Sequence, residues 1–361
     1  MAPEQAVAFA PGRVNLIGEH TDYNGGLALP FAISQGVVVS ARRSDDERVR
    51  VHAGDLDEDD AFALDDRSRA DGWRAFVRGA VAELSDAGAP LPGASLQIGG
   101  DLPRGAGLSS SAALEVSLCL ALLALTGERV QPLAADPAAP GQRERRERRL
   151  ALARLCARVE NDWVGAQTGL LDQLASLFGQ RDSALRIDFQ TLDVETVPLQ
   201  LHEWRLIVLD SGERHAHASG GYNERRAECA KAGELLGVRW LSQADAAAVE
   251  RLPEPLRRRA RHVLSENARV REAIDALREA DMPALGLLLD ASHASLREDF
   301  QISTPAVEAT VARLSDAGAA GARLMGGGFG GCVLALFAPG ARPPQGAIEV
   351  RPGPGAHLRD T

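Results

Sequence analysis

DLPRGAGLSSSAALEVSLCLALLALTG, residues 101–127, carries the pattern from which the core of the fold is predicted. It opens with a glycine-rich turn and continues, from about Ser109 to Leu125, as a helix that is apolar on most faces, which predicts a buried helix. Gly105 and Gly107 allow the main chain to approach a ligand closely. The serines stand at the helix start, where unpaired N–H groups and the helix dipole attract phosphate. The stretch predicts either an anion site or an ordinary serine-capped helix after a turn.

Strands and helices alternate irregularly on both sides of this helix. Apolar or alternating runs predict strands at residues 27–40, 48–52, 94–98, 184–189 and 206–210. Periodic amphipathic or charged runs predict helices at residues 73–87, 143–161, 170–180, 219–236, 242–252, 255–279, 283–297 and 304–316. No regular strand–helix–strand period is visible, so the predicted fold class is α+β. The pattern changes near residues 180–205, which predicts two domains, residues 1–190 and 191–361.

Length and charge exclude several classes of protein. At roughly 100–200 residues per domain, the 361 residues predict about two domains. The 40 basic and 50 acidic side chains give a formal charge of −10, which argues against a nucleic-acid partner. No apolar run reaches the roughly 18–20 residues that span a membrane, and the N-terminus lacks the pattern of a secretory signal. We expect a monomer in the cytoplasm.

Cysteine and lysine usage narrows the chemistry. The four cysteines stand far apart without a C-x-x-C pair, so no zinc or dithiol motif is predicted, and scattered reduced thiols are typical of the cytoplasm. Lys231 is the only lysine, and it lies in a polar helical stretch. A Walker A loop and a protein-kinase site each need a lysine at the phosphates, so both classes of nucleotide site are excluded. Pyridoxal chemistry is disfavoured for the same reason.

A polar loop near the N-terminus, PGRVNLIGEHTDYNGG at residues 11–26, lies between apolar segments. It collects the side chains of Arg13, Glu19, His20, Asp22, Tyr23 and Asn24. Carboxylates on a short loop accept hydrogen bonds from hydroxyl groups, which favours a neutral polyhydroxylated ligand such as a sugar. The alternative is a polar turn with local side-chain capping.

Near the C-terminus, MGGGFGGC at residues 325–332 holds five glycines in eight residues. Each glycine loses much conformational freedom on folding. The segment is therefore either a flexible turn or a place where the main chain approaches a ligand or another loop closely.

Two further carboxylates are candidates for chemistry. Asp172 lies among leucines, which is typical either of a helix cap or of a partly buried base held ionised by a cation, for which Arg13 is the candidate. Glu160 could complete a magnesium site with Ser111. Weaker candidates are the pair His215 and His217, which lacks a third metal ligand nearby, and Tyr222, which is either a ligand contact or a surface ring.

Several of these segments resemble the motifs of one enzyme family. PRGAGLSSSAALE and LMGGGFGGC are similar to the second and third motifs of the GHMP small-molecule kinases. GRVNLIGEHTDYN resembles the signature of the galactokinase group within that family, and SHASLREDFQISTP at residues 292–305 resembles a further segment of the same group. The resemblance covers nearly the whole chain.

The resemblance implies ATP-dependent phosphorylation of the anomeric hydroxyl of galactose, with ATP as co-substrate and Mg²⁺ as cofactor. It implies an N-terminal domain like domain 2 of ribosomal protein S5, a ferredoxin-like C-terminal domain and a site between them. The small-molecule partners would be the sugar and ATP, with no nucleic acid and no membrane.

The same comparison assigns roles to residues. The sugar would lie at Glu19, His20, Thr21, Asp22, Gly169 and Tyr222. The phosphate loop would be Gly105, Ala106, Gly107, Leu108, Ser109, Ser110 and Ser111, with Trp73 on the nucleotide side. Ser111 and Glu160 would hold Mg²⁺, Asp172 matches the family's catalytic aspartate, and Arg13 matches its partner arginine.

Two alternatives remain open at this stage. A related sugar 1-kinase could act on N-acetylgalactosamine or arabinose, because the acidic loop is compatible with several polyols. A catalytically silent regulator could bind sugar and ATP without turnover, although such proteins usually lose part of the catalytic set, and Arg13 and Asp172 are present here.

Overall fold

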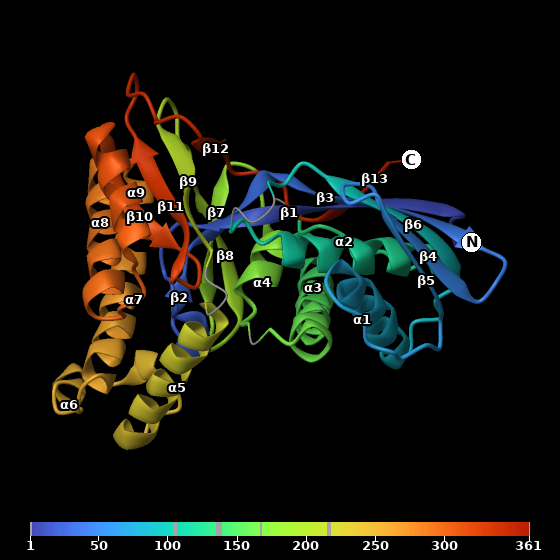
Figure 1. Ribbon diagram of the computed structural model, residues 1–361, viewed down its shortest axis with the longest axis horizontal. Helices are drawn as coiled ribbons and strands as arrows, with labels where there is room; N and C mark the ends of the chain where they lie inside the picture. The colour runs from blue at the N-terminus through green and yellow to red at the C-terminus, as the bar shows by residue number, and fades with distance from the viewer. Residues whose placement is uncertain (1, 104–106, 135–138, 167, 215–217, 361) are drawn as a thin grey trace.

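The computed structural model describes residues 2–360 apart from 104–106, 135–138, 167 and 215–217. The molecule is elongated, with a large sheet and its helices at one end and a second sheet with long helices at the other (Figure 1). A short three-stranded sheet, ordered β2-β7-β8, lies between the two ends. Its strands are β2 Leu27–Ala28, β7 Ser183–Asp188 and β8 Asp193–Pro198.

The N-terminal sheet has six strands in the order β13-β1-β3-β6-β4-β5. Only β4 and β6 pair in parallel; the other neighbours are antiparallel. Strand β1 pairs with β3 along most of its length, with an irregularity between Pro11 and Arg13. Such a bulge bends a strand and re-aims its side chains. The strands are β1 Gln5–Asn15, β3 Pro30–Ser44, β4 Arg48–Ala53, β5 Glu58–Ala63, β6 Gly93–Gly100 and β13 His357–Arg359.

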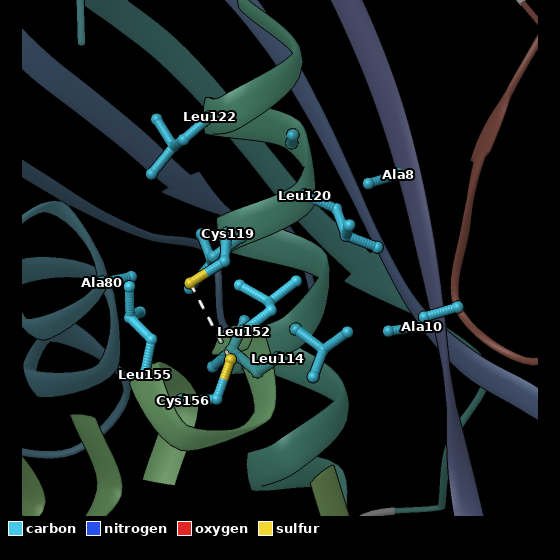
Figure 2. Close-up of a cluster of buried hydrophobic side chains, with 14 of the residues drawn as sticks. Ala8, Ala10, Ala80, Leu114, Cys119, Leu120, Leu122, Leu152, Leu155 and Cys156 are labelled. Carbon is cyan, nitrogen blue, oxygen red and sulfur yellow. Dashed lines mark hydrogen bonds between the residues drawn. The ribbon is translucent and has the colours of Figure 1, made fainter. Parts of the chain in front are cut away.

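Helix α2, Ser110–Leu125, is the centre of the N-terminal core, and every residue from Ala112 to Leu125 is buried. The helix packs on one face of the sheet and is covered on its other side by α1 Trp73–Asp86 and α3 Gln142–Arg158, while α4 Leu171–Phe178 packs against both α2 and strands β1 and β3. Small side chains on β1, such as Ala8 and Ala10, lie where Leu120 of α2 meets the sheet (Figure 2). The predicted buried helix is confirmed.

Four free cysteines are buried, and two of them meet in this core. Cys119 of α2 and Cys156 of α3 have their sulfur atoms 3.9 Å apart, among Leu114, Leu152 and Leu155 (Figure 2). They fill space between the two helices as small apolar side chains do.

The C-terminal sheet is antiparallel in the order β10-β11-β9-β12, and α8 and α9 pack against β10. Its strands are β9 Arg205–Arg214, β10 Ala319–Met325, β11 Gly330–Phe337 and β12 Ile348–Val350. The helices are α5 Ala218–Leu236, α6 Ala246–Val249, α7 Leu256–Arg278, α8 Met282–Glu298 and α9 Pro305–Asp316. Among the described residues, no helix combines the length and the apolar content needed to cross a membrane.

One predicted helix is wrong. Residues 242–252 form a 3₁₀ turn, Leu241–Gln243, and then only the four-residue helix α6. The reason is a capping residue inside the periodic run: the Asp245 carboxylate accepts a hydrogen bond from the Ala248 N–H at 2.9 Å and so starts a new helix.

The chain returns to the N-terminal sheet at its end. Strand β13 pairs with β1, with Val7 opposite Arg359. The buried Arg149 of α3 fixes this return, because its guanidinium donates to the carbonyl of Ala356 at 2.7 Å and to that of Gln131 at 2.8 Å. The predicted domain boundary near residue 190 stays a prediction, and strand β13 lies outside the sheet of the C-terminal half.

Candidate active site

A cavity of about 620 Å³ brings together segments from most of the chain. The loop of residues 16–26 between β1 and β2, called the acidic loop here, lines it together with the start of α2, the start of α4 and the glycine-rich turn before β11. Residues 11–15 of the predicted polar loop belong to β1. The lining includes Arg13, Glu19, His20, Asp22, Gly107 to Ser111, Glu160, Thr168, Gly169, Asp172, Tyr222, Gly326 to Gly328, Gly330 and Gly331.

Asp172 and Arg13 form a two-pronged ion pair at the floor of this cavity. Arg13 Nε donates to Asp172 Oδ1 at 2.7 Å, and the Arg13 Nη2 donates to Oδ2 at 3.0 Å. Asp172 lies in the first turn of α4, and Arg13 follows the bulge in β1. The carboxylate therefore binds the arginine rather than capping its own helix, and the candidate cation from the sequence does reach it.

The start of α2 is fixed to the same pair. Arg13 Nη1 donates to the carbonyl of Gly107 at 2.8 Å, and the Arg13 N–H donates to the carbonyl of Leu108 at 3.1 Å. Ser109 has a left-handed backbone (φ 57°), and its hydroxyl donates to Asp172. These contacts aim the N-terminus of α2, with Ser110 and Ser111 in its first turn, at the cavity. Gly105 and Ala106 lie outside the described residues.

Glu19 joins the acidic loop to the glycine-rich turn. Its carboxylate accepts a hydrogen bond from the Gly326 N–H at 2.8 Å and lies 3.2 Å from the guanidinium of Arg323. Gly326 has φ 86° and Gly328 φ 82°, values that favour glycine. An added Cβ at Gly328 would also lie 2.5 Å from Ile302. Gly328 therefore lets the glycine-rich turn lie close to the segment that holds Ile302, as the close-approach interpretation of these glycines expects.

His20 is a neutral, buried ring in the cavity wall. Burial lowers the pKa of His20 to about 3. Its Nδ1 lies 2.8 Å from the hydroxyl of Tyr23, and its ring packs on Tyr222 at 5.4 Å and on Phe300 at 4.6 Å between centroids. The residue also has φ 60°, a conformation that non-glycine residues adopt only when their surroundings hold them there.

Asp22 lies directly against Gly169 in the cavity wall. An added Cβ on Gly169 would lie 2.0 Å from Asp22 Oδ2, so only glycine leaves room for this carboxylate. Burial raises the pKa of Asp22 to about 6, and the charges of Glu19 and Asp172 add to the rise. A carboxylate this crowded by negative charge is suited to accepting hydrogen bonds from neutral hydroxyl groups.

Two predicted site residues do not line the cavity. Thr21 is fully buried, with its hydroxyl 2.9 Å from the carbonyl of Gly18 and 2.8 Å from that of Leu27, so it stabilises the loop from inside. The indole of Trp73 donates to Glu58 at 2.8 Å at the start of α1. His215 and His217 lie outside the described residues.

Glu160 lies in the short π-helical turn Val159–Val164 and lines the cavity near Asp172. Its Oε2 accepts hydrogen bonds from Thr168 at 2.8 Å and from Gln173 at 2.9 Å, and Ser111 lines the same cavity. Burial, and then the negative charge of Asp172, raises the pKa of Glu160. In the described part of the chain, no group of three or more His, Cys, Asp or Glu side chains could hold a metal ion on its own.

Comparison with known proteins decides the family. The galactose-binding signature of galactokinases matches residues 2–43, and the N- and C-terminal GHMP kinase domains match residues 75–180 and 273–350. The galactokinase of Roseiflexus sp. is 43% identical over 91% of this chain and 83% of its own length. The chain belongs to the galactokinase family. The Mycobacterium tuberculosis galactokinase is also 43% identical, over 91% of this chain and 87% of its own length.

Solved structures agree with this membership. The Lactococcus lactis galactokinase in complex with galactose is 31% identical and superimposes with a TM-score of 0.85, covering 98% of this chain and 95% of its own. The Methanococcus jannaschii mevalonate kinase shares the fold at 17% identity, with a TM-score of 0.66 over 96% of this chain and 98% of its own. The predicted α+β GHMP kinase fold is confirmed.

Two buried polar residues that the sequence did not single out, Gln173 and Glu115, support Glu160 from behind the cavity lining. Gln173 donates to Glu160, and it also donates to Glu115 of α2 at 3.3 Å. Glu115 is fully buried, and burial raises the pKa of its carboxyl to about 10, with the charge of Glu160 adding to the rise. The available signal was a lone carboxylate inside an otherwise apolar helix, because such a group is buried only if it is neutral or partnered.

We expect Glu115 to make stability fall as pH rises. The folded chain keeps a proton on this carboxyl up to about pH 10, whereas the unfolded chain loses it near 4.5. The free energy of unfolding therefore declines between these values, by at most about 1.4 kcal/mol per pH unit for one proton. Glu115→Gln has no such proton, so urea unfolding across this range should show a flatter decline and a more stable variant at neutral pH. Parallel curves for the two proteins would refute the buried neutral carboxyl.

Proposed function

We propose that this chain transfers the terminal phosphoryl group of ATP to the anomeric hydroxyl of D-galactose, giving galactose 1-phosphate and ADP. The observation that carries the proposal is the Arg13–Asp172 pair at the point where the acidic loop and the N-terminus of α2 meet in one cavity. The bond from the terminal phosphorus to the sugar oxygen forms, the bond to the bridging oxygen of ADP breaks, and the hydroxyl proton leaves.

The sugar end of the cavity is the acidic loop. Glu19, Asp22 and the neutral His20 offer acceptors and a ring nitrogen to hydroxyl groups, and Tyr222 closes the side. Gly169 leaves the space in which Asp22 sits, and Thr21 keeps the loop in shape. This end of the cavity supports a neutral polyol and disfavours an anionic substrate, because the carboxylates of Glu19, Asp22 and Asp172 lie close together.

The nucleotide end is the start of α2. Main-chain N–H groups of the loop Gly105 to Ser111 and the positive end of the helix dipole would bind the phosphates. Trp73 remains a proposed contact on the nucleotide side. With its only lysine far along the sequence in α5, the site relies on these groups and on Arg13 for positive charge. Such transfer depends on alignment and on neutralising charge at the phosphoryl group.

Ser111 and Glu160 fit the magnesium ion that this chemistry uses. Both offer oxygen donors, which Mg²⁺ prefers, and Mg²⁺ commonly takes only one or two protein ligands together with water and phosphate oxygens. Burial and the charge of Asp172 raise the pKa of Glu160, and a cation beside the carboxylate would favour its ionised form. When bound, the ion would neutralise charge on the phosphates.

Asp172 is the proposed acceptor of the sugar proton. Arg13 and Ser109 fix its orientation with three hydrogen bonds, as a catalytic carboxylate requires. A positioning and electrostatic role is the alternative, because a loose phosphoryl-transfer transition state asks little of the nucleophile.

The substrate is tested by measuring ADP release over a panel of sugars that includes galactose, glucose, arabinose and N-acetylgalactosamine, with NMR to identify the phosphorylated carbon. We expect turnover with galactose at carbon 1, since the cavity holds the polar groups for its hydroxyls. Preferred turnover of another sugar would establish a different sugar 1-kinase. Binding of sugar and ATP without ADP release would indicate a silent regulator.

Asp172→Asn should lower kcat by roughly 10²–10⁴-fold while ATP binding by calorimetry is kept, because the amide cannot accept the proton. Asp60→Asn is the matched control. Asp60 also forms a two-pronged pair, with Arg78 at 3.0 Å on both arms, but outside the cavity. Near-parental kcat in Asp172→Asn would remove this residue from the chemistry.

Ser111→Ala and Glu160→Ala should each raise the Mg²⁺ concentration needed for half-maximal rate, because each loses an oxygen ligand. A magnesium titration of initial rates measures the shift. Ser117→Ala is the control, since Ser117 is a buried serine of the same helix whose hydroxyl donates to the carbonyl of Leu114 at 3.0 Å. Superimposable titrations for all four proteins would contradict the ion site.

A further inference from the structure

The main chain of the acidic loop is held by side chains from the C-terminal half of the molecule. Four of these side chains, His262, Glu266, Asn267 and Arg323, are buried. We call them the loop clamp. Three lie on α7, and the fourth lies on β10.

The α7 members contact both ends of the loop. Glu266 Oε1 accepts a hydrogen bond from the Gly18 N–H at 2.9 Å, and Asn267 Oδ1 accepts one from the Leu27 N–H at 2.7 Å. His262 lies one helical turn before Glu266, so the two side chains share a face of α7.

His262 makes a specific contact with the residue next to His20. Its Nε2 donates to the carbonyl of Glu19 at 3.1 Å, while its Nδ1 accepts from the hydroxyl of Ser295 at 2.8 Å. Burial lowers the pKa of His262 to about 4, so the ring is neutral and can make one donation and one acceptance.

Arg323, on strand β10 of the C-terminal sheet, is the fourth member of the loop clamp. Its Nη1 donates to the carbonyls of Asn15 at 2.9 Å and Leu16 at 3.2 Å, where β1 ends. Its Nη2 lies 3.2 Å from Glu19 Oε1. One fully buried cation thus fixes both the strand end and the carboxylate that lines the cavity.

We propose that the loop clamp is a set of positioning residues that fixes the sugar-binding loop, and with it Glu19 and His20, in the conformation that binds the sugar. This inference rests on the proposed function for its substrate. The loop needs outside support, because His20 holds a left-handed backbone that its own sequence does not favour. The clamp does not line the cavity, and on the N-terminal side of the molecule it contacts the acidic loop and the strand ends that flank it, so we expect its loss to affect the sugar and not the nucleotide.

The test compares Arg323→Met with Arg149→Met. Both arginines are buried and donate to main-chain carbonyls, but Arg149 holds the chain end and not the loop. At a temperature well below either melting point, we expect Arg323→Met to raise the KM for galactose about 10–100-fold, with the KM for ATP within about twofold of the parent. Hydrogen exchange by mass spectrometry should quicken in peptides covering residues 15–27. Arg149→Met should lower the Tm and change neither of the other two readouts.

A second pair keeps the test decisive if Arg323→Met does not fold. His262→Gln keeps a hydrogen-bond donor near the position of Nε2, whereas His262→Leu, of similar size, has none. The glutamine variant should therefore lie closer to the parent in its KM for galactose and in the hydrogen exchange of residues 15–27. Parental galactose KM and parental exchange in Arg323→Met and His262→Leu would overturn the clamp, as would equal changes in Arg149→Met. If the parent protein does not phosphorylate galactose, the proposed function fails, and the exchange comparison still decides whether the clamp orders the loop.

Discussion

The ion pair between Arg13 and Asp172 is the interaction on which the rest of the site depends. It joins the end of β1 to the start of α4, and through Ser109 and Gly107 it also holds the start of α2. A partly buried pair is favourable only when geometry and further hydrogen bonds offset desolvation, and here both prongs and a serine hydroxyl do so. Three segments distant in sequence are therefore fixed around one carboxylate.

The same arrangement explains how phosphate binding can proceed without a lysine. A helix that is buried all round cannot shift without breaking its packing, so its N-terminus is a fixed source of partial positive charge. The carboxylates Asp22, Glu19 and Glu160 line the same cavity, and burial raises the pKa of Asp22 and of Glu160. The cavity is thus divided between an end suited to hydroxyl groups and an end suited to phosphates.

Local patterns predicted most elements because their causes are local. The apolar run of α2, the periodicity of α7 and the proline at the start of α9 all coincide with helices in the structure. The prediction failed at residues 242–252, where a single capping aspartate overrides periodicity. It also missed several strands, among them β5, β8 and β13. The three-residue β13 has no pattern of its own and exists only through pairing with β1.

The amino-acid sequence is enough to assign the family, the three motifs and the residue types at the site, since motif spacing and the absence of a suitably placed lysine do not depend on how the chain folds. It did not determine that Thr21 faces inward, that Gln173 and Glu115 lie beside Glu160, or that Arg323 reaches Glu19. These are contacts between residues far apart in the chain, and a side chain's direction at such a contact depends on how the sheets and helices pack. Only the tertiary structure decides them, because burial and distance arise from packing and not from neighbours in sequence.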